Sequence, residues 1–196
     1  QGTLALDGGG ALMNQSIHGV DALVWVAGAT MPDLPPAANP VEQVVAMTAV
    51  RAHDRERLEV EDTCVAVLEL RNGCLGQLLA ATSLYPGRLR RFLFGGRGGT
   101  AEIEEEQLVT WQFREALPDD EATRERFGAA SGTSGGAADP LAIDYSCHTR
   151  NFQSFFAAVA AGRRPSLDGR EGRKAVAIIE ACYRSARTGR IVSLKD

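Results

Sequence analysis

Apolar residues recur at three- and four-residue steps over residues 11–27, directly after three consecutive glycines. This period predicts an amphipathic helix with one buried face. Gly28 is placed to end that helix as a C-cap, and the proline-containing residues 31–36 should form a loop, because proline lacks a backbone donor. The predicted buried face holds Met13, Ile17, Val20, Val24 and Ala27.

Between residues 41 and 113 the pattern changes to short apolar runs, which are typical of strands. Asn72-Gly73 separates two of these runs and is the strongest short hairpin signal, because both residues tolerate a positive φ. Consecutive strands with tight turns predict a mainly antiparallel sheet. The expected strands are residues 44–50, 63–70, 75–83, 89–94, 100–104 and 108–113.

Two more helices are expected in the last third of the chain. One covers residues 146–161, and the other follows Asp168, which is a suitable N-cap, and ends at Gly189. Residues 190–194 fit a final strand. Residues 127–140 are rich in Gly, Ser and Ala and are expected to form a mobile surface loop.

These elements predict an α+β fold, a two-layer α/β arrangement with helices packed on one face of an open, mainly antiparallel sheet. Val65 and Val67 alternate with Ala66 and Leu68, so one strand is apolar on both faces. The second face is therefore expected to be a dimer interface or to contact a neighbouring domain. There is no internal repeat, and we expect a single domain over residues 1–196.

Composition narrows the function. A net charge of -4 and a pI near 5.5 argue against nucleic-acid binding, and no apolar run approaches the roughly 20 residues that span a bilayer. The four cysteines form no Cys-x-x-Cys pair, and we expect small buried residues in a reducing cytoplasm. A disulfide between Cys64 and Cys74, which flank the hairpin, is the alternative. Gln1 in place of an initiator Met indicates that the sequence begins inside a longer protein.

The candidate catalytic residues lie on the first predicted helix. Asn14, His18 and Asp21 are spaced i, i+4 and i+7 and would share one face. An imidazole there can take a proton from a substrate hydroxyl. Asp21 would hold the ring, Asn14 would donate to a substrate oxygen, and the glycines at 8–10 would let the backbone approach a ligand. The alternative is a surface histidine with no catalytic role.

Two other positions are weaker candidates for substrate contact. Tyr85, with arginines at 88, 90 and 91, would line a pocket for a polyol or sugar acid, and the alternative is a solvated strand edge. His148 begins a predicted helix, where it would either contact substrate or serve as a cap. No second histidine lies near His18, so no metal site is predicted.

Several motifs, in the same order along the chain, resemble the glucose–fructose oxidoreductase / inositol dehydrogenase / MocA (Gfo/Idh/MocA) oxidoreductase family. The first is Gly8-Gly9-Gly10-Ala11-Leu12-Met13-Asn14-Gln15-Ser16-Ile17-His18-Gly19-Val20-Asp21, with Trp25 and Gly28 beyond it. The others are residues 59–63, 82–87, 95–100, 162–165 and 181–189, so that the resemblance covers nearly the whole chain.

The resemblance implies a two-domain enzyme. An N-terminal Rossmann domain binds NAD or NADP, and a C-terminal α/β domain supplies substrate contacts and a dimerising sheet. His18 would be the acid/base and Asn14 its partner, although many members carry Asp there and an amide cannot ionise. In some members a histidine matching His148 lies near the pocket. This sequence has no Gly-x-Gly-x-x-Gly after a strand, so the dinucleotide-binding domain is expected to be absent and no cofactor to be bound by this chain alone.

We therefore expect the substrate-side domain of a cytoplasmic NAD(P)-dependent oxidoreductase for a sugar, cyclitol or related polyol. The chain would be inactive alone and would form a homo-oligomer through its sheet face. Two alternatives stay open: an NAD-dependent glycosidase, whose net reaction is hydrolysis, and a non-catalytic dimerisation or ligand-binding module.

Overall fold

The computed structural model describes residues 2–54, 56, 58–128 and 146–194. The chain divides into two compact units. The first unit contains residues 1–84 and 153–196, and the second contains residues 85–152. Every strand pair is antiparallel, but the strands form two open sheets, one in each unit.

The sheet of the first unit has the strand order β3-β2-β1-β7. Its strands are β1 (Val41–Ala49), β2 (Thr63–Leu70), β3 (Leu75–Ala81) and β7 (Val192–Ser193). The predicted hairpin joins β2 to β3, and Gly73 has the positive φ of 80° that its turn requires. The strand expected over residues 190–194 is confirmed as the short β7, which pairs with the start of β1.

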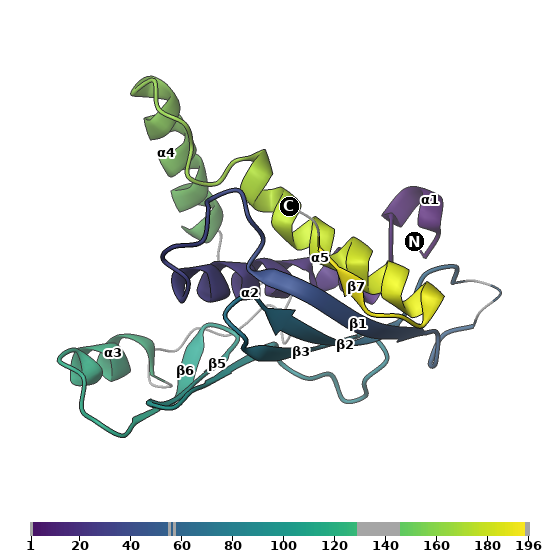
Figure 1. Cartoon of the computed structure of the whole chain (residues 1–196), viewed down its shortest axis with the longest axis horizontal. Helices are drawn as coiled ribbons and strands as arrows, with labels where there is room; N and C mark the ends of the chain where they lie inside the picture. The colour runs from purple at the N-terminus through teal and green to yellow at the C-terminus, as the bar shows by residue number, and fades with distance from the viewer. Residues whose placement is uncertain (1, 55, 57, 129–145, 195–196) are drawn as a thin grey trace. The chain divides into compact units, whose positions relative to one another are not determined.

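The helices of the first unit cover one face of this sheet (Figure 1). They are the π-helical turn η1 (Ala11–Gln15), α2 (Ile17–Ala29) and α5 (Gly169–Thr188), whereas the short α1 (Leu4–Asp7) buries no residue. As predicted, Asp168 caps α5 by accepting from the backbone N–H groups of residues 170 and 171, and Gly189 ends it. The core lies between helices and sheet and includes Leu12, Val20, Val44, Leu68, Ile178 and Ile179.

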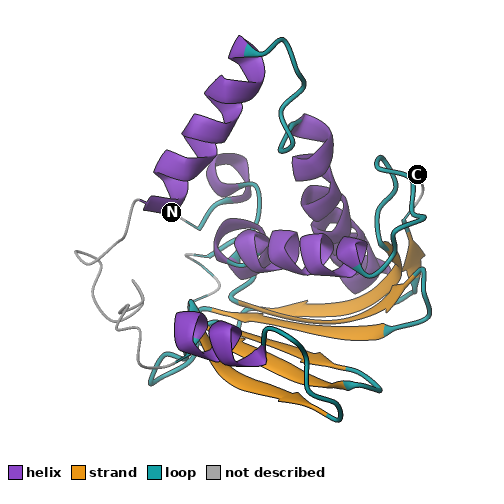
Figure 2. Cartoon of the chain, turned by 90° about the vertical axis from the view of Figure 1, so that its left-hand side faces the viewer, coloured by secondary structure: helices purple, strands orange, loops and turns teal. Residues whose placement is uncertain are grey.

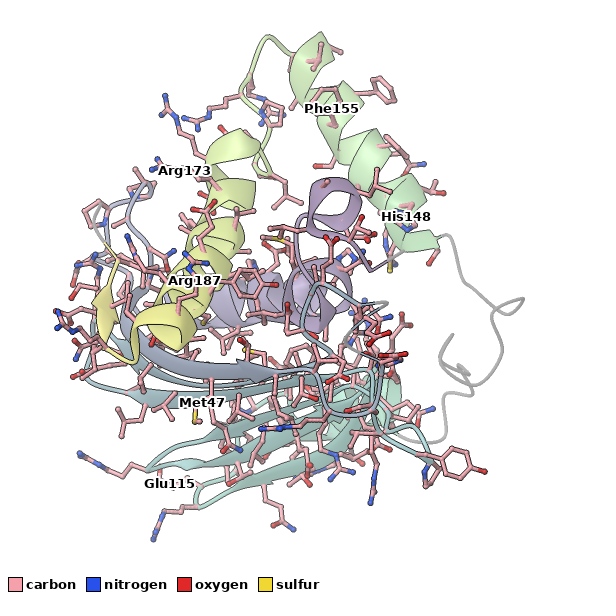
Figure 3. All side chains as sticks on the ribbon, turned by 90° about the vertical axis from the view of Figure 1, so that its right-hand side faces the viewer. Met47, Glu115, His148, Phe155, Arg173 and Arg187 are labelled. Atoms are coloured by element: carbon pink, nitrogen blue, oxygen red, sulfur yellow. The ribbon has the colours of Figure 1, made fainter. Side chains whose placement is uncertain are left out.

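Strand β2 shows which side chains of the sheet face the helices and which face away from them. Ala66 and Leu68 are buried beneath the helices, whereas Val65 and Val67 point to the other face and are about half exposed. In Figure 3, Met47 of β1 likewise extends from the sheet on the side away from α5. The prediction that helices pack on one face is confirmed, and the other face is left apolar.

A buried serine fastens α5 to the sheet. The Oγ of Ser185 accepts from the backbone N–H of Ala46 at 3.0 Å and donates to the carbonyl of Arg190 at 2.6 Å. Among the described residues, β7 pairs with residues 43 and 44 of β1 and does not reach the N–H of Ala46, which points to the same edge of the strand. The Ser185 hydroxyl satisfies this N–H instead.

The second unit is a three-stranded meander with a short helix against it. It contains β4 (Arg91–Gly95), β5 (Gly99–Glu104), β6 (Gln107–Phe113) and α3 (Asp120–Phe127), which Figure 2 shows as a small sheet carrying one helix. The indole Nε1 of Trp111 donates to Asp120 at 2.6 Å, which joins β6 to α3. Helix α4 (Ser146–Ala160) crosses the division between the units.

Three predictions of elements were wrong or incomplete. The continuous helix over residues 11–27 is interrupted at Ser16, where η1 ends before α2 begins. Gly28 is not a C-cap but lies inside α2, which ends at Ala29 because the Thr30 hydroxyl donates to the carbonyl of Ala27. Helices α1 and α3 were not predicted. Of the loop expected over residues 127–140, Phe127 instead ends α3, and residues 129–140 lie outside the described residues.

Cysteines 64, 74, 147 and 182 are all free, so the alternative of a Cys64–Cys74 disulfide is wrong. Cys64 is buried opposite Ala80 on β3, whereas Cys74 is exposed beside the turn. Burial raises the pKa of the Cys64 thiol to about 12. Among the described residues, no helix is long and apolar enough to cross a membrane.

Asp62, at the entry to β2, is a buried carboxylate surrounded by donors. It accepts from the backbone N–H groups of Arg51, Ala52 and His53, from the Thr63 hydroxyl at 2.8 Å, and pairs with His53 Nδ1 at 3.1 Å. Burial opposes its ionisation, but these hydrogen bonds prevail and hold the pKa of Asp62 well below its usual range.

Replacing Asp62 with Asn should lower the free energy of unfolding by about 2–3 kcal/mol at pH 7, because an amide presents N–H groups to donors. The folded-state pKa is depressed, so the contribution of the carboxylate is fully present above its unfolded pKa of about 3.9 and is lost as pH falls below it. Urea unfolding at pH 7 and pH 3 should show the difference between Asp62→Asn and wild type shrinking in acid. An equal difference at both pH values would contradict this account.

Candidate active site

The helix that carries the predicted site residues begins with a widened turn. The N–H of Ser16 donates to the carbonyl of Ala11 five residues earlier, at 3.0 Å, which is the π-helical pattern. Helix α2 then starts at Ile17, so His18 lies in its first turn. Single π-helical turns are frequent at functional sites.

A carboxylate from a distant part of the chain holds this turn in place. Glu61 Oε2 accepts from the N–H of Gly10 at 3.0 Å, and Glu61 Oε1 accepts from the N–H of Leu12 at 2.9 Å. The backbone carbonyl of Glu61 accepts from the N–H of Ala11, also at 2.9 Å. Tyr183 of α5 donates its hydroxyl to Glu61 Oε1 at 2.8 Å. These residues, with Glu61 at their centre, form the Glu61 clamp.

The glycines before η1 are explained by this clamp. A Cβ on Gly10 would overlap the backbone carbonyl of Glu61, and a Cβ on Gly9 would lie 2.5 Å from the Tyr183 hydroxyl oxygen. The expectation that these glycines let the backbone approach a ligand is therefore corrected, because the close neighbours of Gly9 and Gly10 are Tyr183 and Glu61.

His18 and Asp21 line a groove of about 570 Å³ in the first unit. One wall is α2, the second is the proline-containing loop after it, and the third is the start of α5. The Asn39 side chain donates to the carbonyl of Lys174 at 2.9 Å and so joins the loop to α5. The lining is mainly apolar, with an exposed Trp25 one to two turns beyond His18, and the Lys174–Glu171 ion pair adds charge.

The other predicted site residues are placed differently. Asn14 is exposed on η1 and is not among the groove residues, because the π-helical turn interrupts the helix on which a shared face was predicted. Tyr85 is fully exposed and belongs to the second unit. His148 also belongs to that unit, at the exposed start of α4 (Figure 3). The structure thus brings His18 and Asp21 to one groove, and the contacts expected of Tyr85 and His148 stay predictions.

Two helix starts that could receive a dinucleotide phosphate are occupied by carboxylates of the chain itself. A pyrophosphate needs free N–H groups at a glycine-rich turn before a helix. The turn at Gly10 is the obvious candidate, but the N–H groups of Gly10, Ala11 and Leu12 are all bound to Glu61. The start of α5 is likewise filled by the Asp168 carboxylate. The part of the chain that the structure describes also contains no cluster of side chains suited to a metal ion.

Sequence reasoning missed Glu61 and Tyr183 as residues of the site. Glu61 lies 51 positions from Gly10 and 122 from Tyr183, so no local pattern connects them. The available signal was that Glu61 and Tyr183 each belong to one of the motifs that resemble the oxidoreductase family, residues 59–63 and 181–189.

The fold and the groove define the class of this protein as the C-terminal α/β domain of an oxidoreductase. Residues 5–194 match the model of the Gfo/Idh/MocA oxidoreductase family, C-terminal alpha/beta domain, and the chain belongs to this family. No curated protein matches the chain.

Solved structures of dehydrogenases are similar to the chain. The WlbA dehydrogenase from Bordetella pertussis, in complex with NADH and UDP-GlcNAcA, is 31% identical over 96% of this chain with a TM-score of 0.73. The corresponding enzyme from Chromobacterium violaceum, with the same ligands, is 31% identical over 95% with a TM-score of 0.67. A levoglucosan dehydrogenase with NADH and L-sorbose, at 18% identity over 100% of the chain and a TM-score of 0.71, shows the same fold.

The chain spans about half the length of these proteins: 49%, 46% and 52% of the three chains. It therefore matches one domain of longer enzymes.

A pair of glycine substitutions tests the clamp. Gly10→Ala should lower the free energy of unfolding by more than about 2 kcal/mol, because the new Cβ meets the backbone of Glu61, which cannot move without breaking the clamp. Gly28→Ala is the matched control, since a Cβ there meets nothing within 4 Å and alanine favours a helix interior by about 1 kcal/mol. Urea denaturation measures both. Equal stability of the two variants would contradict the close approach at Gly10.

Proposed function

We propose that this chain is the substrate-side domain, over residues 1–196, of an NAD- or NADP-dependent oxidoreductase acting on a sugar, cyclitol or related polyol. The observation that carries the proposal is His18, exposed in the first turn of α2 and lining a groove, in a chain of this oxidoreductase family. A sugar is favoured because both relatives at 31% identity were solved with UDP-GlcNAcA.

In this proposal the chain binds and orients the carbinol and moves its proton. The imidazole of His18 takes the hydroxyl proton during oxidation and returns it during reduction, a task suited to a group that exchanges protons near neutral pH. Asn14 contributes an amide that donates to a substrate oxygen, and Asp21, one turn beyond His18, accepts from a hydroxyl or orients the ring. Tyr85 and His148 are proposed as further residues for substrate contact.

The dinucleotide is assigned to the other half of a longer protein, where it accepts or supplies hydride. Two observations support this assignment. The glycine-rich turn before α2 is filled by Glu61, and the chain matches half of the NADH-bound relatives. The isolated chain should accordingly be inactive.

We also propose that the protein works in the cytoplasm. Four free cysteines, of which Cys64 and Cys182 are buried, suit a reducing compartment.

Substitution of His18 tests the reaction. In the longer protein that contains this chain, His18→Ala should lower kcat for NADH-linked turnover of a sugar by about 10²–10⁴-fold, with UDP-GlcNAcA as the first substrate to try. The control is Gln15→Ala, which removes an exposed polar side chain from η1 outside the groove and should keep turnover within twofold.

Unchanged turnover in His18→Ala would overturn the catalytic role and favour a non-catalytic module. Release of an aglycone without accumulation of NADH would instead favour the glycosidase reaction. Turnover of a polyol with NAD by the 196-residue chain alone would contradict the assignment of the dinucleotide to another domain.

We also propose that two copies of the chain associate through the uncovered face of the first sheet. This face presents exposed apolar side chains from three neighbouring strands, and contiguous apolar surface on an otherwise charged protein marks an interface. A second copy is the simplest occupant, since an antiparallel sheet face related by a two-fold axis is complementary to itself. The exposed apolar residues are Val45, Met47, Val65, Val67, Leu75 and Leu79.

The substitution Met47→Glu should convert a dimer to a monomer, because it would bury a carboxylate without a partner in the interface. Light scattering after size exclusion measures the mass. Arg173→Glu, on α5 and so on the opposite side of the sheet, is the control for a charge change and should leave the dimer intact (Figure 3). A Met47→Glu variant with the wild-type mass would exclude this face.

A further inference from the structure

We propose that Glu61 is a positioning residue for the proton transfer at His18: its carboxylate fixes the turn that carries Asn14 and leads into the helix of His18. This inference rests on the proposed function of His18. Glu61 itself is assigned no contact with substrate, and its effect is transmitted through the backbone of η1.

Both carboxylate oxygens of Glu61 are committed to the turn. Oε2 binds the N–H of Gly10, and Oε1 binds the N–H of Leu12 and the hydroxyl of Tyr183. The carbonyl of Glu61 takes the intervening N–H of Ala11. Three consecutive backbone donors at the start of η1, which have no partners earlier in the helix, are thus all held by one residue.

The charge of the Glu61 carboxylate strengthens its hydrogen bonds to the backbone of η1. Hydrogen bonds to an ionised carboxylate are about twice as strong as neutral ones, and a negative charge is favoured at the beginning of a helix. The burial of Tyr183 and its hydrogen bond to Glu61 raise the pKa of its hydroxyl, so this group stays a neutral donor throughout the working range of pH. Tyr183 comes from α5, and the clamp therefore connects the turn to the main helix of the core.

The path from the clamp to the candidate base is short. Leu12 is fully buried and fixed by Glu61, and His18 follows six residues later, across the π-helical turn. A turn with this widened pattern is less stable than a regular α-helix and needs outside contacts to persist. Loss of those contacts would let η1 shift, and a displacement of about 1 Å at a reacting group costs up to about 10²-fold in rate.

Asp62 provides a matched comparison, because it is the next residue and also binds backbone N–H groups through a carboxylate. Asp62, however, holds residues 51–53, and its side-chain hydrogen bonds to the described residues do not include the turn before α2. Changing Glu61 to Gln or Asp62 to Asn removes one charge and preserves shape in each case. A general loss of stability should affect both variants, whereas a positioning role should affect only Glu61→Gln.

The experiment measures steady-state kinetics of both variants in the longer protein. Glu61→Gln should lower kcat at least tenfold while the KM for the dinucleotide changes less than twofold, and Asp62→Asn should keep kcat within threefold. A kcat of Glu61→Gln within twofold of wild type, or an equal loss in Asp62→Asn, would overturn the proposal. Tyr183→Phe, which removes only one hydrogen bond, serves if Glu61→Gln does not fold: a threefold or larger loss of kcat is expected, and no loss counts against the proposal.

Hydrogen exchange separates this inference from the proposed reaction. In the 196-residue chain, Glu61→Gln should increase exchange of the Gly10 and Leu12 amides at least tenfold, whereas Asp62→Asn should leave them unchanged. Unchanged exchange in Glu61→Gln would refute the clamp whatever the enzyme does. Unchanged turnover in His18→Ala, by contrast, would refute the proposed reaction itself and the positioning role with it, while leaving the exchange result intact.

Discussion

The hydrogen bonds of Glu61 connect three parts of the first unit that are distant in sequence: the turn before α2, the entry to β2 and the middle of α5. The backbone must come very close to Glu61 and Tyr183 for these bonds to form, which is why glycine occupies positions 9 and 10. The conformation of η1, the start of α2 and the exposure of His18 all depend on this contact. The glycine-rich motif is therefore a requirement of packing.

Much of the fold follows from local sequence patterns. Asn72-Gly73 predicted the hairpin, and Asp168 and Gly189 predicted the ends of α5, because each signal lies within a few residues of its effect. The alternation along β2 predicted a strand that is apolar on both faces, but it did not tell which face enters the core. The break at Ser16 was not predictable in this way. The apolar period continues through it, and the clamp that stabilises the π-helical turn comes from about fifty residues away.

The candidate site was predictable only in part. The spacing of His18 and Asp21 within one α-helix placed them on one face, and both line the groove. The same spacing argument failed for Asn14, because η1 is not α-helical. Glu61 carries no signal of its own in the sequence, since a glutamate before a strand is ordinarily a solvated side chain. The groove places an imidazole beside mainly apolar walls, whereas the N–H groups of Gly10, Ala11 and Leu12 are occupied by Glu61.

The Ser185 hydroxyl has a consequence for self-association. The outer edge of β1 is covered by only two residues of β7, and an uncovered edge is where foreign strands add to a sheet. Ser185 occupies the N–H of Ala46, the next donor along that edge, from inside the protein. An incoming strand would have to displace a buried hydroxyl that also holds the end of α5. One side chain thus protects the β1 edge of this sheet against the addition of a foreign strand, whereas the opposite edge is formed by β3.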